Sequence, residues 1–119
     1  MITEDYVSLE IAKLLNTKGF KGEFHKHYWG YELGKEFLTD NSFNPEYDYP
    51  APTLQTVMKW LREVHKLAID IEFQIDCPTW KWRIYHIEPS EDKHTNFQHY
   101  DTYEQACEVA IKYCLENLI

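Results

Sequence analysis

The segment from Ile69 to Asp76 alternates strictly between apolar and polar residues, which is the period of a half-buried β-strand. A four-residue turn is expected at 76–79, around Pro78, and the alternation resumes beyond it. The predicted cross-strand pairs are Ile75 with Trp80, Phe73 with Trp82, Ile71 with Ile84, Glu72 with Arg83 and Gln74 with Lys81. One face is then apolar and the other pairs opposite charges, so the register of an antiparallel hairpin is well specified.

Three helices are expected around this hairpin. The first should end at Gly19, because glycine readily adopts the left-handed backbone conformation that ends helices. The second should run to about His65. The third follows the hairpin and carries a broad apolar face to the end of the chain. Their expected N-caps are Ser8, Thr53, and either Asp101 or Thr102.

The remaining segments predict further strands and one long connection. An aromatic strand is expected within 23–33, with Gly30 at a bend, and another strand around 96–100. The proline-rich segment 39–52 is expected to be irregular. No crossover helix separates the consecutive strands. We therefore expect an α+β fold with an antiparallel sheet of three to four strands, about three helices packed on one face, and one globular domain over 1–119.

Composition narrows the class of protein. The chain has 119 residues, of which 44% are hydrophobic, and this is enough for one core. Its net charge of -8 opposes a phosphate backbone, so nucleic acid is not the favoured partner. The three cysteines form no disulfide pattern, and we find no export signal and no apolar run of membrane-spanning length. We expect a soluble, cytoplasmic protein that does not enter a membrane.

The sequence contains no established catalytic or cofactor-binding motif. The four glycines are scattered and form no phosphate-binding loop, so no cofactor is expected. The nearest approach to a metal site is the pair His25 and His27, because residues two apart on a strand point to one face. Other residues of types that can bind a metal do not have the spacing of a metal-binding motif; they are Cys77, His86, His94 and His99. A metal-dependent enzyme is therefore the least favoured interpretation.

The high aromatic content, 16%, favours a surface that binds another protein. The candidate surface is the loop with Phe43, Tyr47, Asp48 and Tyr49, with Trp29 and Tyr31 alongside. The alternative is that these residues pack the loop onto its own domain. A homodimer through an aromatic face or a sheet edge would also use the surplus aromatics.

Basic residues gather only on the polar face of the second helix. Lys59, Arg62 and Lys66 are spaced so that a nucleic-acid-associated regulator could use them to contact phosphates. The structural alternative is a solvated helix face. The negative charge is also compatible with a protein that imitates nucleic acid, but the charge does not favour this function over the others.

Three segments are informative when they are compared with known sequences: 47–55 running into 59–65, 103–108 running to 113–119, and 7–20. They resemble an uncharacterised family of short proteins encoded by prophages and related mobile elements of gut anaerobic bacteria. The resemblance carries no activity and no site residues. It implies a mobile-element accessory role inside a bacterial cell. We therefore expect a small non-enzymatic protein that acts by binding a protein partner. A host protein is one candidate for this partner.

Overall fold

The computed structural model describes residues 5–28, 38–39, 42–46, 48–88, 93–95 and 98–119. Within these residues the chain forms three α-helices and two three-stranded antiparallel sheets, so the predicted α+β class is confirmed. In chain order the elements are α1 (Leu9–Thr17), β1 (Lys26–Tyr28), β2 (Leu38–Thr39), β3 (Tyr49–Ala51), α2 (Leu54–Val64), β4 (Leu67–Gln74), β5 (Thr79–His86), β6 (Lys93–Thr95), α3 (Tyr103–Tyr113) and the π-helical turn η1 (Cys114–Leu118).

The helices begin where their capping residues predict. The hydroxyl oxygens of Ser8, Thr53 and Thr102 each accept a hydrogen bond from a backbone N–H in the first turn of the helix that follows. Gly19 ends α1 with a φ of 78°, and the Phe20 N–H donates to the carbonyl of Leu15, as in a Schellman cap. Local sequence therefore determines both ends of α1 and the starts of α2 and α3.

The larger sheet has the strand order β4-β5-β6 and contains the predicted hairpin. Its register differs from the predicted one by two residues, since Phe73 pairs with Trp80 instead of Trp82. The pairing of β4 with β5 ends at Gln74, so Ile75 does not pair with Trp80 as predicted. The turn occupies 75–78 because Thr79, a β-branched residue, joins β5 and pairs with Gln74. A shift of two preserves the faces, so the apolar side and the charged side are those that the alternation predicts.

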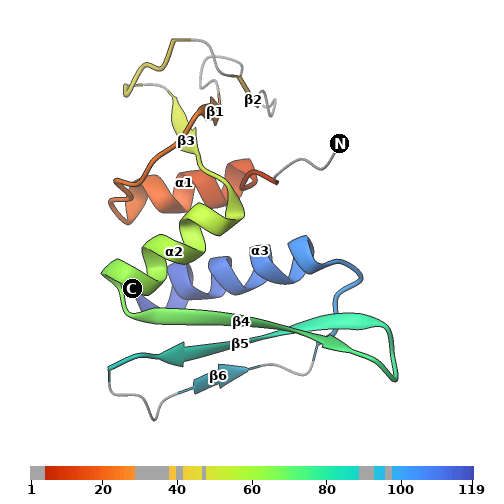
Figure 1. Cartoon of the computed structure of the whole chain (residues 1–119). Coiled ribbons are helices and arrows are strands. Elements are labelled where there is room, and N and C mark those ends of the chain that lie inside the picture. Colours follow the sequence, from red (N-terminus) through yellow and green to blue (C-terminus); the bar gives the residue numbers. More distant parts are fainter. Residues whose placement is uncertain (1–4, 29–37, 40–41, 47, 89–92, 96–97) are drawn as a thin grey trace.

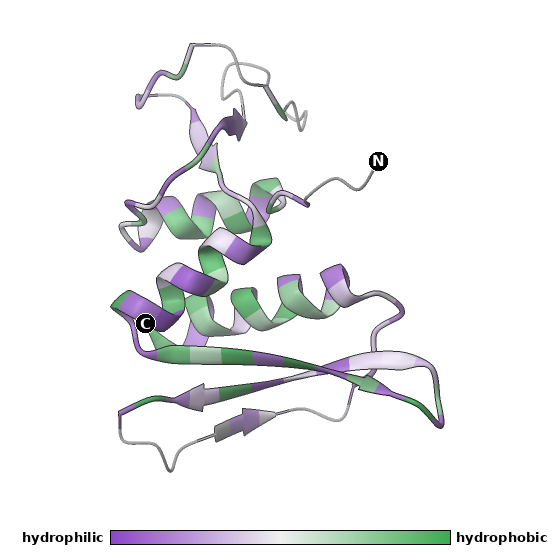
Figure 2. Cartoon of the chain, in the orientation of Figure 1, coloured by the Kyte–Doolittle hydropathy of each residue, from purple (hydrophilic) through white to green (hydrophobic). Residues whose placement is uncertain are grey.

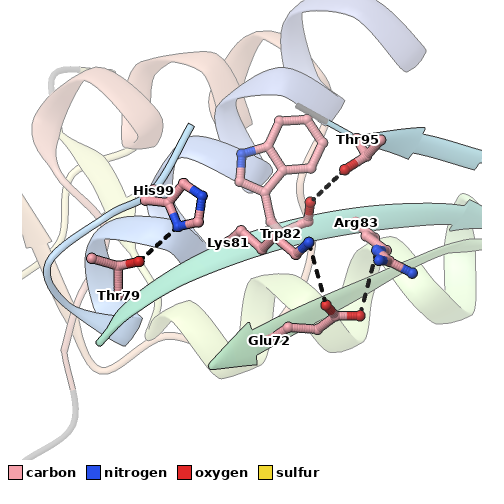
Figure 3. Close-up of polar contacts among 7 residues, drawn as sticks. All are labelled: Glu72, Thr79, Lys81, Trp82, Arg83, Thr95 and His99. Atoms are coloured by element: carbon pink, nitrogen blue, oxygen red, sulfur yellow. Dashed lines mark hydrogen bonds and ion pairs between the residues drawn. The ribbon is translucent and has the colours of Figure 1, made fainter. Parts of the chain in front are cut away.

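Helices cover one face of this sheet. Figure 1 shows α2 and α3 above β4 and β5, with α1 and the smaller sheet farther from the hairpin. The indole of Trp82 points from β5 toward the helix layer (Figure 3) and packs against Tyr113 of α3 at 5.2 Å between ring centroids. Two polar contacts join α1 to α3: Ser8 N–H donates to Glu108, and Lys112 pairs with Glu10 at 2.7 Å.

The smaller sheet, in the order β2-β1-β3, divides the strands differently from the prediction of one sheet. Two of its strands fall in and beside the segment 39–52 that was expected to be irregular. Tyr28 anchors β1, because its hydroxyl donates to the carbonyl of Val7 at 2.6 Å in a buried position. The predicted strand around 96–100 is also misplaced: β6 lies at Lys93–Thr95, and Tyr100 forms only an isolated bridge with Trp80. Gly30 lies outside the described residues.

Candidate functional site

Asp48, predicted to bind a partner, is instead buried within the chain. It is 6% exposed, and its Oδ2 lies 3.5 Å from Nε2 of His27, which is 2% exposed. The same carboxylate oxygen accepts a hydrogen bond from the Asn44 N–H at 2.8 Å. In return the Asp48 N–H donates to the Asn44 carbonyl. These contacts fix the loop on β1, so Asp48 has a structural role in the loop.

The described aromatic residues of that loop also contact the chain itself. Phe43 lies edge-on to Phe24 and His27, at 5.0 and 5.2 Å between centroids. Tyr49 is half-buried, and the Lys13 ammonium lies 5.8 Å from its ring centroid. Tyr47 lies outside the described residues, as do Trp29 and Tyr31. The alternative in which the loop packs onto its own domain therefore holds for Asp48 and Tyr49, whereas Phe43 stays partly exposed.

The metal candidates His25 and His27 are not placed as a ligand pair. His25 is exposed and precedes β1, whereas His27 is buried against Asp48. Across the described ranges no three His, Cys, Asp or Glu side chains gather closely enough to hold a metal ion. Residues two apart point to one face only when both lie on the strand, and β1 begins at Lys26, one residue after His25.

The basic stripe of α2 is shorter than the sequence indicates. Lys59 and Arg62 are exposed on the helix, but Lys66 follows its C-terminal end, with a φ of 57°. A cavity of about 330 Å³ beside Lys59 is lined by Gly22, Glu23, Thr56, Lys59, Trp60 and Glu63. Because two glutamates share this cavity with one lysine, the surface is of mixed charge and offers no uniform site for phosphates.

The two helical cysteines are inert. Burial raises the pKa of Cys107 to about 11 and that of Cys114 to about 12, so both remain protonated thiols at neutral pH. Each packs in the hydrophobic core, as small apolar residues do. Cys77 is exposed in the β4–β5 turn. Within the described residues no helix has the length and apolar character needed to cross a membrane.

The far end of the hairpin exposes apolar side chains that the fold leaves uncovered. Ile75 is 85% exposed in the turn, and Phe73, at the end of β4, is 48% exposed. The Phe73 ring contacts Trp80 at 5.0 Å between centroids, and Trp80 contacts Tyr103 at 5.4 Å. We call Phe73, Ile75 and Trp80 the hairpin patch. Figure 1 shows the reason for its exposure: the hairpin extends beyond the N-terminal end of α3, so none of the described helices covers its far end.

The base of the hairpin patch is held in place by α2 and α3. Tyr103 is the first residue of α3, and its hydroxyl accepts a hydrogen bond from Nε2 of Gln55 at 3.0 Å. Partial burial raises the pKa of Tyr103, and the bond from Gln55 opposes that rise. Figure 2 shows hydrophobic colour recurring along β4 out to the turn. The apolar face of the sheet thus continues from the core into solvent.

Polar contacts fix the shape of the hairpin end. The Thr79 hydroxyl donates to the Cys77 carbonyl at 2.9 Å, and it lies 2.7 Å from Nδ1 of His99 (Figure 3). Trp80 and Tyr100 exchange two backbone hydrogen bonds. On the face of the sheet opposite Phe73 and Trp80, Glu72 contacts both Lys81 and Arg83, at 3.9 and 3.4 Å (Figure 3). The hairpin patch therefore lies on an ordered support.

The sequence indicated the hairpin but not its exposed end. The alternation placed Ile75 and Phe73 on the paired apolar face, where they would be expected to join the core. The residues Pro78 and Thr79 could have corrected this prediction. Thr79 favours a strand and follows Pro78, so β5 begins at Thr79 and the turn lies one residue closer to the N-terminus than predicted.

Comparisons with known proteins give no further guide. No protein-family model matches the chain, and searches of curated proteins and of solved structures likewise return no match.

Proposed function

We propose that this protein is a non-enzymatic binding protein that recognises a protein partner through the hairpin patch. The observation that carries the proposal is the 85% exposure of Ile75 beside the half-exposed Phe73. Single exposed apolar residues are common on protein surfaces. Adjacent ones on an ordered aromatic base are typical of sites that bind a protein.

The physical balance favours association at this patch. Phe73 and Trp80 are already in contact, so little side-chain freedom is lost when a partner covers them. Burying one large apolar side chain stabilises a complex by about 1.5–3 kcal/mol. Asp76, which is exposed in the turn, and the partly exposed Gln74 and Thr79 on either side of the turn supply the polar rim that such interfaces have. This surface replaces the loop of Asp48 and Tyr49 as the proposed contact.

The resemblance to short prophage-encoded proteins extends the proposal to a cellular role. We infer a mobile-element accessory protein that acts inside a bacterial cell on a host protein or on a second copy of itself. The net charge of -8 favours a protein partner over nucleic acid.

Affinity capture tests the proposal with three forms of the protein. The patch variant combines Phe73→Thr, which replaces one strand-favouring residue by another that is polar, with Ile75→Ser. The control is Val64→Ser, since Val64 is 59% exposed but lies on α2. In nuclease-treated lysate, wild type and control should capture the same protein in stoichiometric amount, and the patch variant should lose it. Equal capture by all three forms would refute the proposal, as would capture that disappears with nuclease.

A further inference from the structure

We propose that His86 and His94 form a two-imidazole binding site for a late divalent transition metal ion, of the class of Cu²⁺, Ni²⁺ and Zn²⁺. The proposal rests on the position of their ring nitrogens: Nε2 of His86 lies 2.9 Å from Nε2 of His94. It is independent of the hairpin patch, which lies at the other end of β5.

Strand pairing places the two rings together. His94 is the Cα partner of Ile84, and His86 lies two residues beyond Ile84 on β5. Residues two apart on a strand share a face, so both imidazoles are on the side of the sheet where Ile84 is buried. Diagonal neighbours on adjacent strands are within reach of long side chains. The backbone ladder thus positions the pair before any ligand binds.

Packing from α3 restricts the pair further. The His94 ring lies 5.8 Å from that of Tyr113, which in turn packs on the buried Trp82. Both histidines are only partly buried, so water can reach the nitrogens and fill coordination positions that the protein leaves open. Restricted rings with accessible nitrogens are what a metal site requires.

The distance between the nitrogens fits a shared metal ion. Two nitrogens at about 2.05 Å from one metal and at right angles to each other lie about 2.9 Å apart, and in a tetrahedral site they lie about 3.3 Å apart. The observed 2.9 Å is the length of the hydrogen bond between the two rings, whose centroids lie 5.0 Å apart. Because the nitrogens are already this close, a small reorientation of the rings lets both lone pairs converge on one ion of the class of Cu²⁺, Ni²⁺ or Zn²⁺. Without metal, the Nε2–H of one ring donates a hydrogen bond to the Nε2 lone pair of the other. When an ion accepts both Nε2 lone pairs, the ring that donated carries its proton on Nδ1 instead.

The donor set defines the kind of site. Imidazole nitrogens suit these ions, whereas Mg²⁺ and Ca²⁺ prefer oxygen ligands. In the part of the chain that the structure describes, no third His, Cys, Asp or Glu joins the pair. Water therefore completes the coordination, and the ion is exchangeable. When bound, it links the edge strand β6 to β5 and stabilises the folded state.

Isothermal titration of the tag-free, EDTA-treated protein with NiCl₂ or CuCl₂ tests the site. Wild type should bind one ion per chain, and His86→Ala and His94→Ala should each weaken binding at least tenfold. The matched control is His25→Ala, because His25 is exposed and directly precedes β1, which is not a strand of the sheet that holds His86 and His94. This control should bind as wild type does. The metal should also raise the thermal midpoint of wild type and of the control, but not that of either site variant.

Three results would overturn the proposal: no saturable binding to wild type, binding that survives both site substitutions, or binding lost in only one of them. Circular dichroism and the metal-free thermal midpoint show that each variant is folded, so loss of binding can be assigned to the missing imidazole.

Discussion

Substitution by alanine should greatly reduce the unfolding free energy at one isoleucine of the hairpin and leave it nearly unchanged at another. Ile84 is 0% exposed on β5, whereas Ile75 projects from the turn. Ile84→Ala removes three buried carbon groups worth about 0.8 kcal/mol each, or about 2.4 kcal/mol of transfer free energy. The cavity left behind raises the expected loss of unfolding free energy to about 3–4 kcal/mol. Ile75→Ala removes exposed atoms and should change it by less than about 0.5 kcal/mol.

Urea denaturation followed by circular dichroism measures both values, with the slope m compared to verify that each variant unfolds in the same way. The reasoning would be refuted by a cost above about 1.5 kcal/mol for Ile75→Ala, because that residue would then belong to the core. A cost below about 1 kcal/mol for Ile84→Ala would equally contradict the observed register. The expected result makes Ile75 a position where binding can be changed without loss of stability.

A helix cap, the burial of two cysteines and the burial of His65 each have a measurable consequence. Thr102→Ala removes the acceptor for the Gln105 N–H at 3.0 Å and should lower the unfolding free energy by about 1 kcal/mol in urea titrations, whereas Thr102→Asn should not. Cys77 alone should react with a thiol reagent in the native protein, and Cys107 and Cys114 should react only in denaturant; rapid labelling of all three would contradict their burial. Burial lowers the pKa of His65, so the unfolded state binds its proton more tightly. The stability from neutral His65 is therefore present above about pH 6.5 and is lost as pH falls through the lowered pKa. His65→Gln should reduce the difference in unfolding free energy between about pH 7.5 and pH 5.5, and an unchanged difference would count against this assignment.

Local sequence was sufficient for the helices. Ser8 and Thr53 each bond to the third residue after them, and Gly19 adopts the left-handed conformation that ends α1. These signals act within one helical turn, so they do not depend on the rest of the fold. The alternation over β4 predicted the faces of the hairpin for a similar reason, since it reports which side meets the core.

Features that depend on the exact pairing of one strand with another were not predicted. The register of the hairpin depends on where the turn closes, and a shift of one residue in the turn moved Ile75 from the paired face into solvent. The approach of His86 to His94 depends on a strand predicted several residues too late, around 96–100. The burial of Asp48 depends on His27 in another strand. Composition and spacing within one segment do not contain this information.

Photo-crosslinking from the hairpin patch tests the central claim most directly. The photoreactive residue p-benzoylphenylalanine replaces Ile75 in one form and Val64 in another, because both side chains are exposed and only one belongs to the patch. Irradiation in host cells should give one discrete protein adduct from position 75 and none from position 64. An adduct of twice the chain mass would identify a second copy as the partner. Absence of any adduct at position 75, or the same adducts from both positions, would contradict the account.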